Sequence, residues 1–482
     1  MKQNLKRVLT LSLAALMLFA TLMVVGCDNI KDPNDETKQP TTGGQSDGTG
    51  TGSETTPPDT IYDELPTGNY GGYELTILQY DDKGAQFSVL MDIEEDDGTL
   101  INSALWKRTI NVESRLNVEI SLLTCETTSD VSDKITADIT AGDCNYDLFS
   151  NHSAHLANQV LNGQAISFAE LEVIDITKPW WNQEVIESTA LGNGEIYMGF
   201  GHINMSCYDA QCALFFNKSL VDEYQLGDVY GMVDAKEWTM DKFITICRNF
   251  AQNGENLYGV GAYPYVGAPG LIYGCNVDFY GKNAEGQLEY LGLTDKMYDV
   301  YSKMGAMLLD KTVANLEWAT YFSSFATEEE LFLICNISGM KYFRNDKVDY
   351  GAAPFPMYNE EQDGYLSYTT NQIQGVCVSF ETKDVARAAT IMENLAAESY
   401  KQMNDVYFDQ LLNERLLRDD KSKEVLAMIF ETPLVLPVNA VYDLGLASNI
   451  FAFDGGDLDI ASRVEACRSA VDAKLKEFYG KT

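Results

Sequence analysis

The sequence predicts an α/β fold built on a mostly parallel sheet, and three observations support this class. Short apolar segments of strand length alternate with longer amphipathic segments between about residues 73 and 150. Apolar residues make up 45% of the chain and aromatic residues 11%, as expected of a folded protein. The 482 residues are enough for two or three domains around a large buried core.

The first predicted elements follow the order strand, helix, strand, helix, strand, which favours parallel pairing. Tyr73–Leu78 alternates apolar and polar residues, as a strand does. Trp106 and Ile110 lie one helical turn apart, and Gly142 ends the second helical pattern. The five elements are expected at residues 73–78, about 100–116, 117–122, 131–142 and 147–150.

The rest of the folded chain is mixed and contains no convincing repeat. Thr239 is expected to cap a helix that carries Phe243 and Phe250, and Trp238 at its start is expected to pack. Trp180 and Trp181 are adjacent, so one ring could be buried and the other exposed. Strands are expected at 212–216, 331–335 and 375–379, and helices at about 239–250, 294–309, within 384–430 and at about 461–479.

The amino terminus carries an export signal. Basic residues at positions 2, 6 and 7 precede an apolar stretch over residues 8–25, so residues 1–26 are predicted to be a signal peptide. Val24-Val25-Gly26-Cys27 resembles a bacterial lipobox, in which the cysteine becomes lipidated. An uncleaved membrane anchor is the alternative. In either case we expect the protein to work at the outer face of the cytoplasmic membrane.

Residues 27–64 are expected to be the lipidated cysteine followed by a flexible linker. Residues 41–53 are rich in Gly, Ser and Thr, which cannot bury apolar surface. The tether over residues 28–60 has a root-mean-square reach of roughly 30 Å.

The net charge limits the partners. A net charge of −38 argues against nucleic acid and against anionic lipid surfaces.

Ten cysteines occur, and nine remain once Cys27 is lipidated. An odd number cannot pair fully within the chain, and several cysteines lie in apolar surroundings, so buried free thiols are expected.

Six segments, in order along the chain, have a familiar pattern. They are Val112–Val118, Ile139–Leu148 (with Gly-Asp and Tyr-Asp-Leu), Lys178–Asn182, Phe216–Leu220, Glu237–Lys242 and Asp349–Pro356. No single segment is decisive, but together they cover nearly the whole mature chain. In this order they resemble segments of extracellular solute-binding proteins of ABC importers, with the maltose-type group (family 1) the most similar.

The resemblance implies a two-lobed, periplasmic-binding-protein-like (type II) fold with a hinge and an interlobe cleft. Lobe 1 is expected at 65–211 with part of 376–415, and lobe 2 at 212–375 with 416–482. The crossings are expected near 212–216, near 374–378 and past Leu416. The partners it implies are a small-molecule solute, expected to be a carbohydrate, and an ABC permease in the membrane. We expect a monomer anchored through Cys27.

Tyr80, Asp81, Asn151, His152 and Met340 follow predicted strands, the segment Tyr263–Tyr265 resembles a ligand-lining turn of the family, and Trp318 lies in a less patterned segment. A carbohydrate site combines aromatic rings, which pack on C–H faces, with planar polar groups. Met340 stands near a place where maltose binders often have a Trp, and this departure argues against a malto-oligosaccharide. The candidates are Tyr80, Asp81, Asn151, His152, Tyr263, Tyr265, Trp318 and Met340.

Signals for catalysis are scarce. The three histidines include His152-x-x-His155, whose spacing is compatible with a metal, but no third ligand pattern accompanies it. Neither an HExxH nor a phosphate-loop motif occurs, and the one GxSxG match (residues 44–48) lies in the Gly/Ser/Thr-rich linker rather than at a strand-to-helix turn. We therefore expect no catalytic residue, metal or cofactor. The alternatives left open are a surface glycan-degrading enzyme, since carboxylate pairs cannot be judged from sequence, and a sensory or adhesive lipoprotein without an importer.

Overall fold

The structure is a computed structural model. It describes residues 64–81, 91–191, 194–264, 267–285, 287–342, 347–409, 417, 419–437, 441–442 and 459–481. The predicted signal peptide, Cys27 and all of the predicted linker before residue 64 lie outside the described residues. No helix in the described part of the chain is long and apolar enough to cross a membrane.

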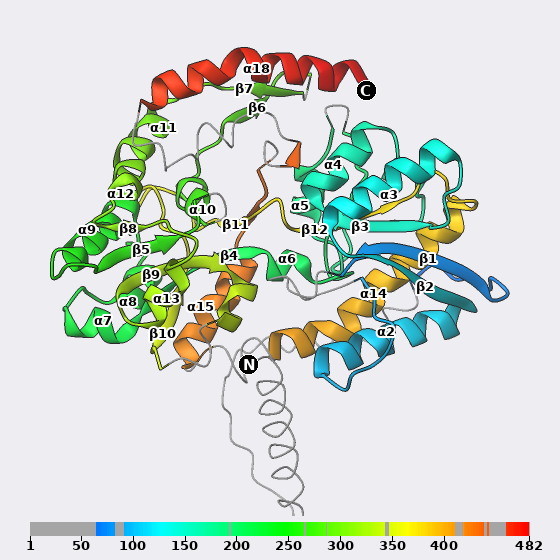
Figure 1. Ribbon diagram of the computed structural model, residues 1–482, viewed down its shortest axis with the longest axis horizontal. Coiled ribbons are helices and arrows are strands. Elements are labelled where there is room, and N and C mark those ends of the chain that lie inside the picture. Colours follow the sequence, from blue (N-terminus) through cyan, green and yellow to red (C-terminus); the bar gives the residue numbers. More distant parts are fainter. Residues whose placement is uncertain are drawn as a thin grey trace, which may run out of the picture. The chain divides into compact units, whose positions relative to one another are not determined.

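The first sheet contains four strands among the described residues, in the order β12-β3-β1-β2. β1 (Tyr73–Tyr80) pairs in parallel with β2 (Val118–Cys125) and β3 (Leu148–His152). β12 (Gln374–Val378) pairs antiparallel with β3, beside which it lies in Figure 1. The predicted parallel order of the first three strands is confirmed, and β12 adds the one antiparallel edge seen in this part of the structure.

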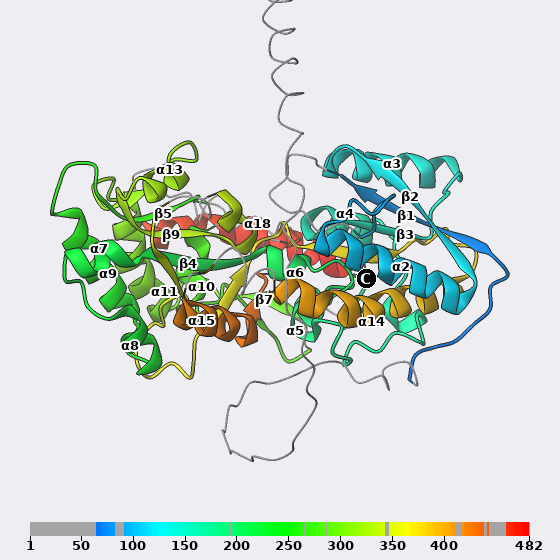
Figure 2. The same ribbon diagram turned by 90° about the horizontal axis from the view of Figure 1, so that it is seen from below.

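Helices cover both faces of the first sheet. Figure 2 shows it between α3 (Thr128–Ala141) on one side and α2 (Leu100–Leu116) with α14 (Val385–Asp409) on the other. α3 begins with a capping box and ends at Gly142, whose φ of 66° suits a residue without a Cβ. α4 (Ser153–Leu161) packs against α3 and β3. Burial on both faces explains why the middle of β1 is apolar.

The second sheet is mixed, and seven of its strands lie in the described ranges. β5 (Tyr258–Ala262) is parallel to β8 (Ala314–Asn315) and to β9 (Glu330–Asn336), while β4 (Gln211–Asn217) is antiparallel to β9. All seven residues of β4 are buried. The remaining strands are β10 (Tyr350–Ala353), β11 (Ser367–Thr369), β13 (Leu434–Val435) and the separate hairpin β6 (Tyr280–Lys282) and β7 (Leu288–Tyr290).

The predicted helix after Trp238 is α9 (Met240–Ala251), which packs on β5. Trp238 is completely buried and donates a hydrogen bond to the Pro354 carbonyl (2.9 Å). Thr239 occupies the N-cap position, although its side chain makes no capping bond. A Cβ at Gly259 of β5 would lie 2.5 Å from the Cys247 side chain, so the close approach of α9 requires glycine there.

Further helices surround the second sheet. The predicted helix at about 294–309 is continuous but contains a π-helical turn (Tyr301–Gly305) between α11 (Asp295–Val300) and α12 (Ala306–Leu309). α18 (Ile460–Lys481) carries an apolar stripe that packs on the β6–β7 hairpin. The helices are α7 (Lys218–Glu223), α8 (Val229–Asp234), α10 (Ala268–Tyr273), α11 (Asp295–Val300), α12 (Ala306–Leu309), α13 (Tyr321–Ala326), α15 (Asp420–Glu431) and α18 (Ile460–Lys481).

The chain passes between the two sheets before β4, between β11 and β12, and between α14 and α15. β4 and β12 are each paired within one sheet, so the crossings flank these strands. Short elements precede β4, namely η2 (Phe168–Glu170), α5 (Gln183–Ser188) and α6 (Ser206–Asp209).

The first two crossings are bonded to each other. The Ser206 hydroxyl donates to the Gln374 carbonyl (2.9 Å) and accepts from the Gln374 N–H (2.7 Å). The Asn204 amide donates to the same carbonyl (3.3 Å). These buried bonds fix where β12 begins.

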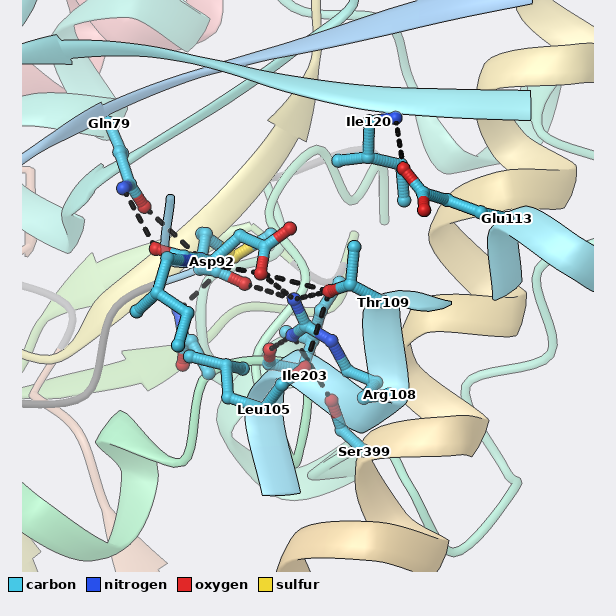
Figure 3. A network of polar contacts seen from close by, with 12 residues as sticks. Gln79, Asp92, Leu105, Arg108, Thr109, Glu113, Ile120, Ile203 and Ser399 are labelled. Atoms are coloured by element: carbon cyan, nitrogen blue, oxygen red, sulfur yellow. Dashed lines mark hydrogen bonds and ion pairs between the residues drawn. The ribbon is translucent and has the colours of Figure 1, made fainter. Parts of the chain in front are cut away.

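A buried polar network joins α2 to the segment after β1 and to α14 (Figure 3). Arg108 is fully buried, pairs with Asp92 (3.3 Å) and donates to the carbonyls of Met91 (2.5 Å) and Ile203 (3.1 Å) and to the Ser399 hydroxyl (3.3 Å). Burial raises the pKa of the Asp92 carboxyl, and Arg108 opposes this shift. Removing one partner of such a pair costs about 3–5 kcal/mol, because the other charge is left buried.

Trp180 and Trp181 are both buried, so neither ring is available to a ligand. Their indole N–H groups donate to the two carboxylate oxygens of Glu393 on α14, at 2.9 and 2.8 Å. Burial raises the pKa of Glu393 to about 7, and the two indole hydrogen bonds oppose the shift. The two adjacent indole rings share Glu393 as their hydrogen-bond acceptor. Because Glu393 lies on a helix that is distant in sequence, the local sequence does not reveal this contact.

The nine cysteines of the described chain are free thiols, and seven of them are buried. Cys125 and Cys144 are half-buried. Burial raises the pKa of Cys207 to about 12, which keeps the thiol protonated and unreactive. The expectation of unpaired, mostly buried cysteines is confirmed for these residues.

Glu393 gives the folded protein a measurable pH dependence. The free energy of unfolding of the wild-type protein, relative to the Glu393→Gln variant, should fall by roughly 3 kcal/mol between about pH 4.5 and pH 7. Over this range the exposed carboxyl of the unfolded chain loses its proton while the buried carboxyl keeps it, so rising pH favours unfolding.

Urea unfolding at pH 4.5 and pH 7.5 measures this difference. Glu172→Gln, which neutralises an exposed glutamate, is the matched control and should show no such trend. If the free energy of unfolding differs between the wild type and Glu393→Gln by the same amount at both pH values, the raised pKa of Glu393 is contradicted.

Candidate functional site

Tyr80, His152 and Gln374 meet where β1 and β3 end and β12 begins. The Tyr80 hydroxyl lies 2.8 Å from His152 Nε2 and accepts a hydrogen bond from the Gln374 amide (2.6 Å). Gln374 and His152 are paired in register across the β3–β12 ladder. The rings of Tyr80 and His152 pack edge to face with centroids 5.3 Å apart. The carboxyl edge of a parallel sheet is where α/β proteins bind ligands.

Asn151 is buried beside this cluster and exposes almost no surface to a ligand. It is 1% exposed, and its amide donates to the Thr128 carbonyl (2.9 Å) and to the Ser132 hydroxyl (3.3 Å). Its side-chain oxygen accepts from the His152 N–H (2.9 Å). Asn151 therefore fixes the end of β3 and the start of α3, and we assign it a supporting place in the site.

His155 lies beside His152, with ring centroids 6.5 Å apart. Its Nδ1 lies 3.1 Å from the Ser132 hydroxyl, and burial lowers its pKa. In the described ranges no three His, Cys, Asp or Glu side chains come close enough to hold a metal ion.

The side chain of Asp81 does not join the cluster of Tyr80, His152 and Gln374. Its side chain lines an acidic recess of about 390 Å³ together with Asp92, Glu94, Glu95 and Glu126, and neither Tyr80 nor His152 lines it. Successive residues at a strand end point in opposite directions, so adjacency in sequence separates these two side chains.

A second group of candidates lies at the carboxyl ends of β5, β8 and β9. The Tyr263 ring follows β5 and packs edge to face against Trp318, with centroids 4.9 Å apart. Trp318 also contacts the buried ring of Tyr321 (5.8 Å). Phe322 continues the row to Tyr342 (5.1 Å). We call Tyr263, Trp318, Phe322 and Tyr342 the aromatic surface.

Two rings of the aromatic surface are open to solvent. Trp318 is 58% exposed and Tyr342 is 51% exposed, whereas most large apolar side chains of this fold are buried. An exposed cluster of aromatic rings in a folded protein commonly marks a place where something binds.

Met340 does not belong to this surface. Its side chain is completely buried in the core with Met205 and Ile337, because the 3-10 turn η4 (Ile337–Tyr342) directs it inward. Tyr342, two residues later, carries the exposed ring, and no periodic pattern of the sequence marks it. Tyr265 lies outside the described residues.

The family model of bacterial extracellular solute-binding proteins matches residues 117–399, which is more than half of the chain. The protein therefore belongs to this family. Its members bind solutes, so the chain is a binding protein and not an enzyme. None of the curated proteins matches the sequence significantly.

Solved structures share the two-lobed type II fold. The cyclic α-maltosyl-1,6-maltose binding protein from Arthrobacter globiformis has a TM-score of 0.59 at 15% identity, with 84% of this chain and 100% of that chain covered. An ABC substrate-binding protein from Listeria monocytogenes in complex with cycloalternan has a TM-score of 0.55 at 12% identity, with 84% and 99% covered.

A third structure is the galacto-N-biose-/lacto-N-biose I-binding protein of an ABC transporter from Bifidobacterium longum, in complex with lacto-N-biose. It has a TM-score of 0.54 at 14% identity, with 85% of this chain and 98% of that chain covered. At these identities the likeness establishes the fold.

Proposed function

We propose that this solute-binding protein captures a carbohydrate, in particular an oligosaccharide, and delivers it to the permease of an ABC importer. The observation that carries the proposal is the aromatic surface, with Trp318 58% exposed. Sugar rings present C–H faces that pack on aromatic rings, and their hydroxyls need planar polar partners. The solved structures that share the fold include complexes with cycloalternan and lacto-N-biose, which supports this ligand class.

The proposed site has two halves. His152, whose ring is held by the buried Tyr80 hydroxyl that the buried Gln374 amide also contacts, supplies an imidazole from the first sheet, and the aromatic surface supplies stacking rings from the second. We propose that the ligand binds between lobe 1 (65–211 with part of 376–415) and lobe 2 (212–375 with 416–482). Closure about the crossings would then present the loaded form to the permease.

Isothermal titration with maltotetraose, cycloalternan, lacto-N-biose and β-1,6-galactobiose tests the ligand class. At least one of these sugars should bind, and Trp318→Ala should weaken that binding roughly tenfold, equivalent to about 1.4 kcal/mol. Tyr298→Ala is the matched control, because Tyr298 is a 55% exposed aromatic residue on α11 outside the site. Absence of binding by every sugar, or equal effects of the two substitutions, would contradict the proposal.

We also propose that Cys27 carries the lipid that holds the protein at the outer face of the membrane. The support is the Val24-Val25-Gly26-Cys27 sequence, the apolar stretch before it and the Gly/Ser/Thr-rich tether over residues 28–60. An anchored binding protein stays near the membrane, so the captured solute remains within one tether length of a permease.

Metabolic labelling with an alkyne fatty acid tests the anchor. The wild-type protein should incorporate the label and Cys27→Ser should not, because the fatty chains are carried by the lipid that is bonded to the Cys27 sulfur. Cys125→Ser, which removes a half-buried thiol of the folded part, should label like the wild type. Equal labelling of the wild type and Cys27→Ser, or none of either, would refute a lipid on this residue.

A further inference from the structure

Trp318 lies in a short connection between β8 and α13 rather than in a helix or strand. A side chain of this size that is 58% exposed gains little from burial, so its direction depends on how the connection is held. Tyr263 and Tyr321 contact the ring from its sides. The backbone beneath the ring needs a separate support.

Asn315, the last residue of β8, supplies that support. Its side-chain oxygen accepts from the Glu317 N–H (3.3 Å) and from the Thr320 hydroxyl (3.2 Å), which brackets Trp318 on both sides in sequence. Its amide group donates to the Ser324 hydroxyl (3.4 Å) and to Glu330 Oε2 (3.1 Å). One side chain that is 5% exposed therefore ties the connection to α13 and to β9.

Glu330 anchors the side chain of Asn315. It is completely buried at the start of β9, and the Asn315 amide is its side-chain hydrogen-bond partner there. Its other carboxyl oxygen has no hydrogen-bond partner within the described residues. Burial raises its pKa well above the ordinary value, which favours the protonated carboxyl, and Oε2 accepts the hydrogen bond from the Asn315 amide.

Gly261 of β5 shows that the carboxyl position is built into the sheet. A Cβ at Gly261 would lie 1.8 Å from Glu330 Oε1, so β5 accommodates Glu330 only because this residue is glycine. Gly261 is paired with Asn315 across the β5–β8 ladder, and the three residues thus fix one another.

We propose that Asn315, seated on the buried carboxyl of Glu330, is a positioning residue that holds the Trp318 ring in the orientation that receives a sugar face. The proposal rests on the proposed function, in which Trp318 stacks on the ligand. Neither Asn315 nor Glu330 touches the ligand, and both act through Trp318.

Tryptophan fluorescence tests the positioning without any ligand. Trp180, Trp181 and Trp238 are buried and Trp106 is half-buried, so Trp318 is the most exposed of the five tryptophans. The fluorescence that is lost in Trp318→Phe is the emission of Trp318. In Asn315→Ala the anisotropy of the Trp318 emission should decay faster than in the wild type, because the ring gains rotational freedom.

Asn283→Ala is the matched control. Asn283 makes the same kind of turn in the β6–β7 hairpin, where its side-chain oxygen accepts from the Glu285 and Gln287 N–H groups (3.1 and 2.9 Å). This variant should leave the Trp318 anisotropy unchanged. Glu330→Gln keeps a neutral acceptor and should resemble the wild type, whereas Glu330→Leu should resemble Asn315→Ala. Circular dichroism identifies the temperatures at which each variant is folded. Unchanged anisotropy in folded Asn315→Ala would overturn the proposal.

A double-mutant cycle separates this inference from the proposed function. The tightest-binding sugar of the four named above is titrated into Asn315→Ala, Trp318→Ala and the double variant. Asn315→Ala should weaken binding about threefold or more, and it should add less than about twofold once Trp318 is absent. If Trp318→Ala alone has no effect, the proposed site is wrong. If Trp318→Ala weakens binding and Asn315→Ala has no effect or an independent one, the positioning role is wrong.

Discussion

The structure depends on the place where β12 begins, at Gln374. The backbone of Gln374 is held by Ser206 and Asn204, which precede β4, while its side chain donates to Tyr80 at the end of β1. Its register partner is His152. One residue thus connects the return crossing to the polar half of the proposed site. Because the bonds are buried, breaking them would leave unpaired polar groups, which costs about 1–3 kcal/mol for each group.

The two halves of the proposed site are built by different physical means. The polar half is preorganised by hydrogen bonds that also complete the first sheet, so its groups keep fixed directions. The aromatic half leaves large rings in contact with water, held by edge contacts and by the Asn315 support. Water is displaced from exposed rings when a sugar face packs on them, and this displacement favours binding. Rigid polar groups then supply selectivity.

The sequence was sufficient for the elements with strong periodicity and insufficient for contacts between distant segments. The strand expected at 73–78 and the helices expected at about 100–116 and 239–250 form, with ends shifted by at most two residues, because their apolar patterns match a single strand or helix period. The burial of Trp180 and Trp181 depends on Glu393, more than 200 positions away, which no local pattern encodes. Similarly, Met340 and Tyr342 lie in one short turn, and only the tertiary packing decides that the methionine is buried and the tyrosine exposed.

Small-angle X-ray scattering tests the central claim most directly, because the account requires a sugar to bind between two lobes that close about the crossings. The radius of gyration is measured for the unliganded protein and again with a saturating amount of the sugar that binds in calorimetry. The radius of gyration should decrease when the sugar binds, because closure brings the two lobes together. An unchanged radius of gyration at full occupancy would contradict this closure.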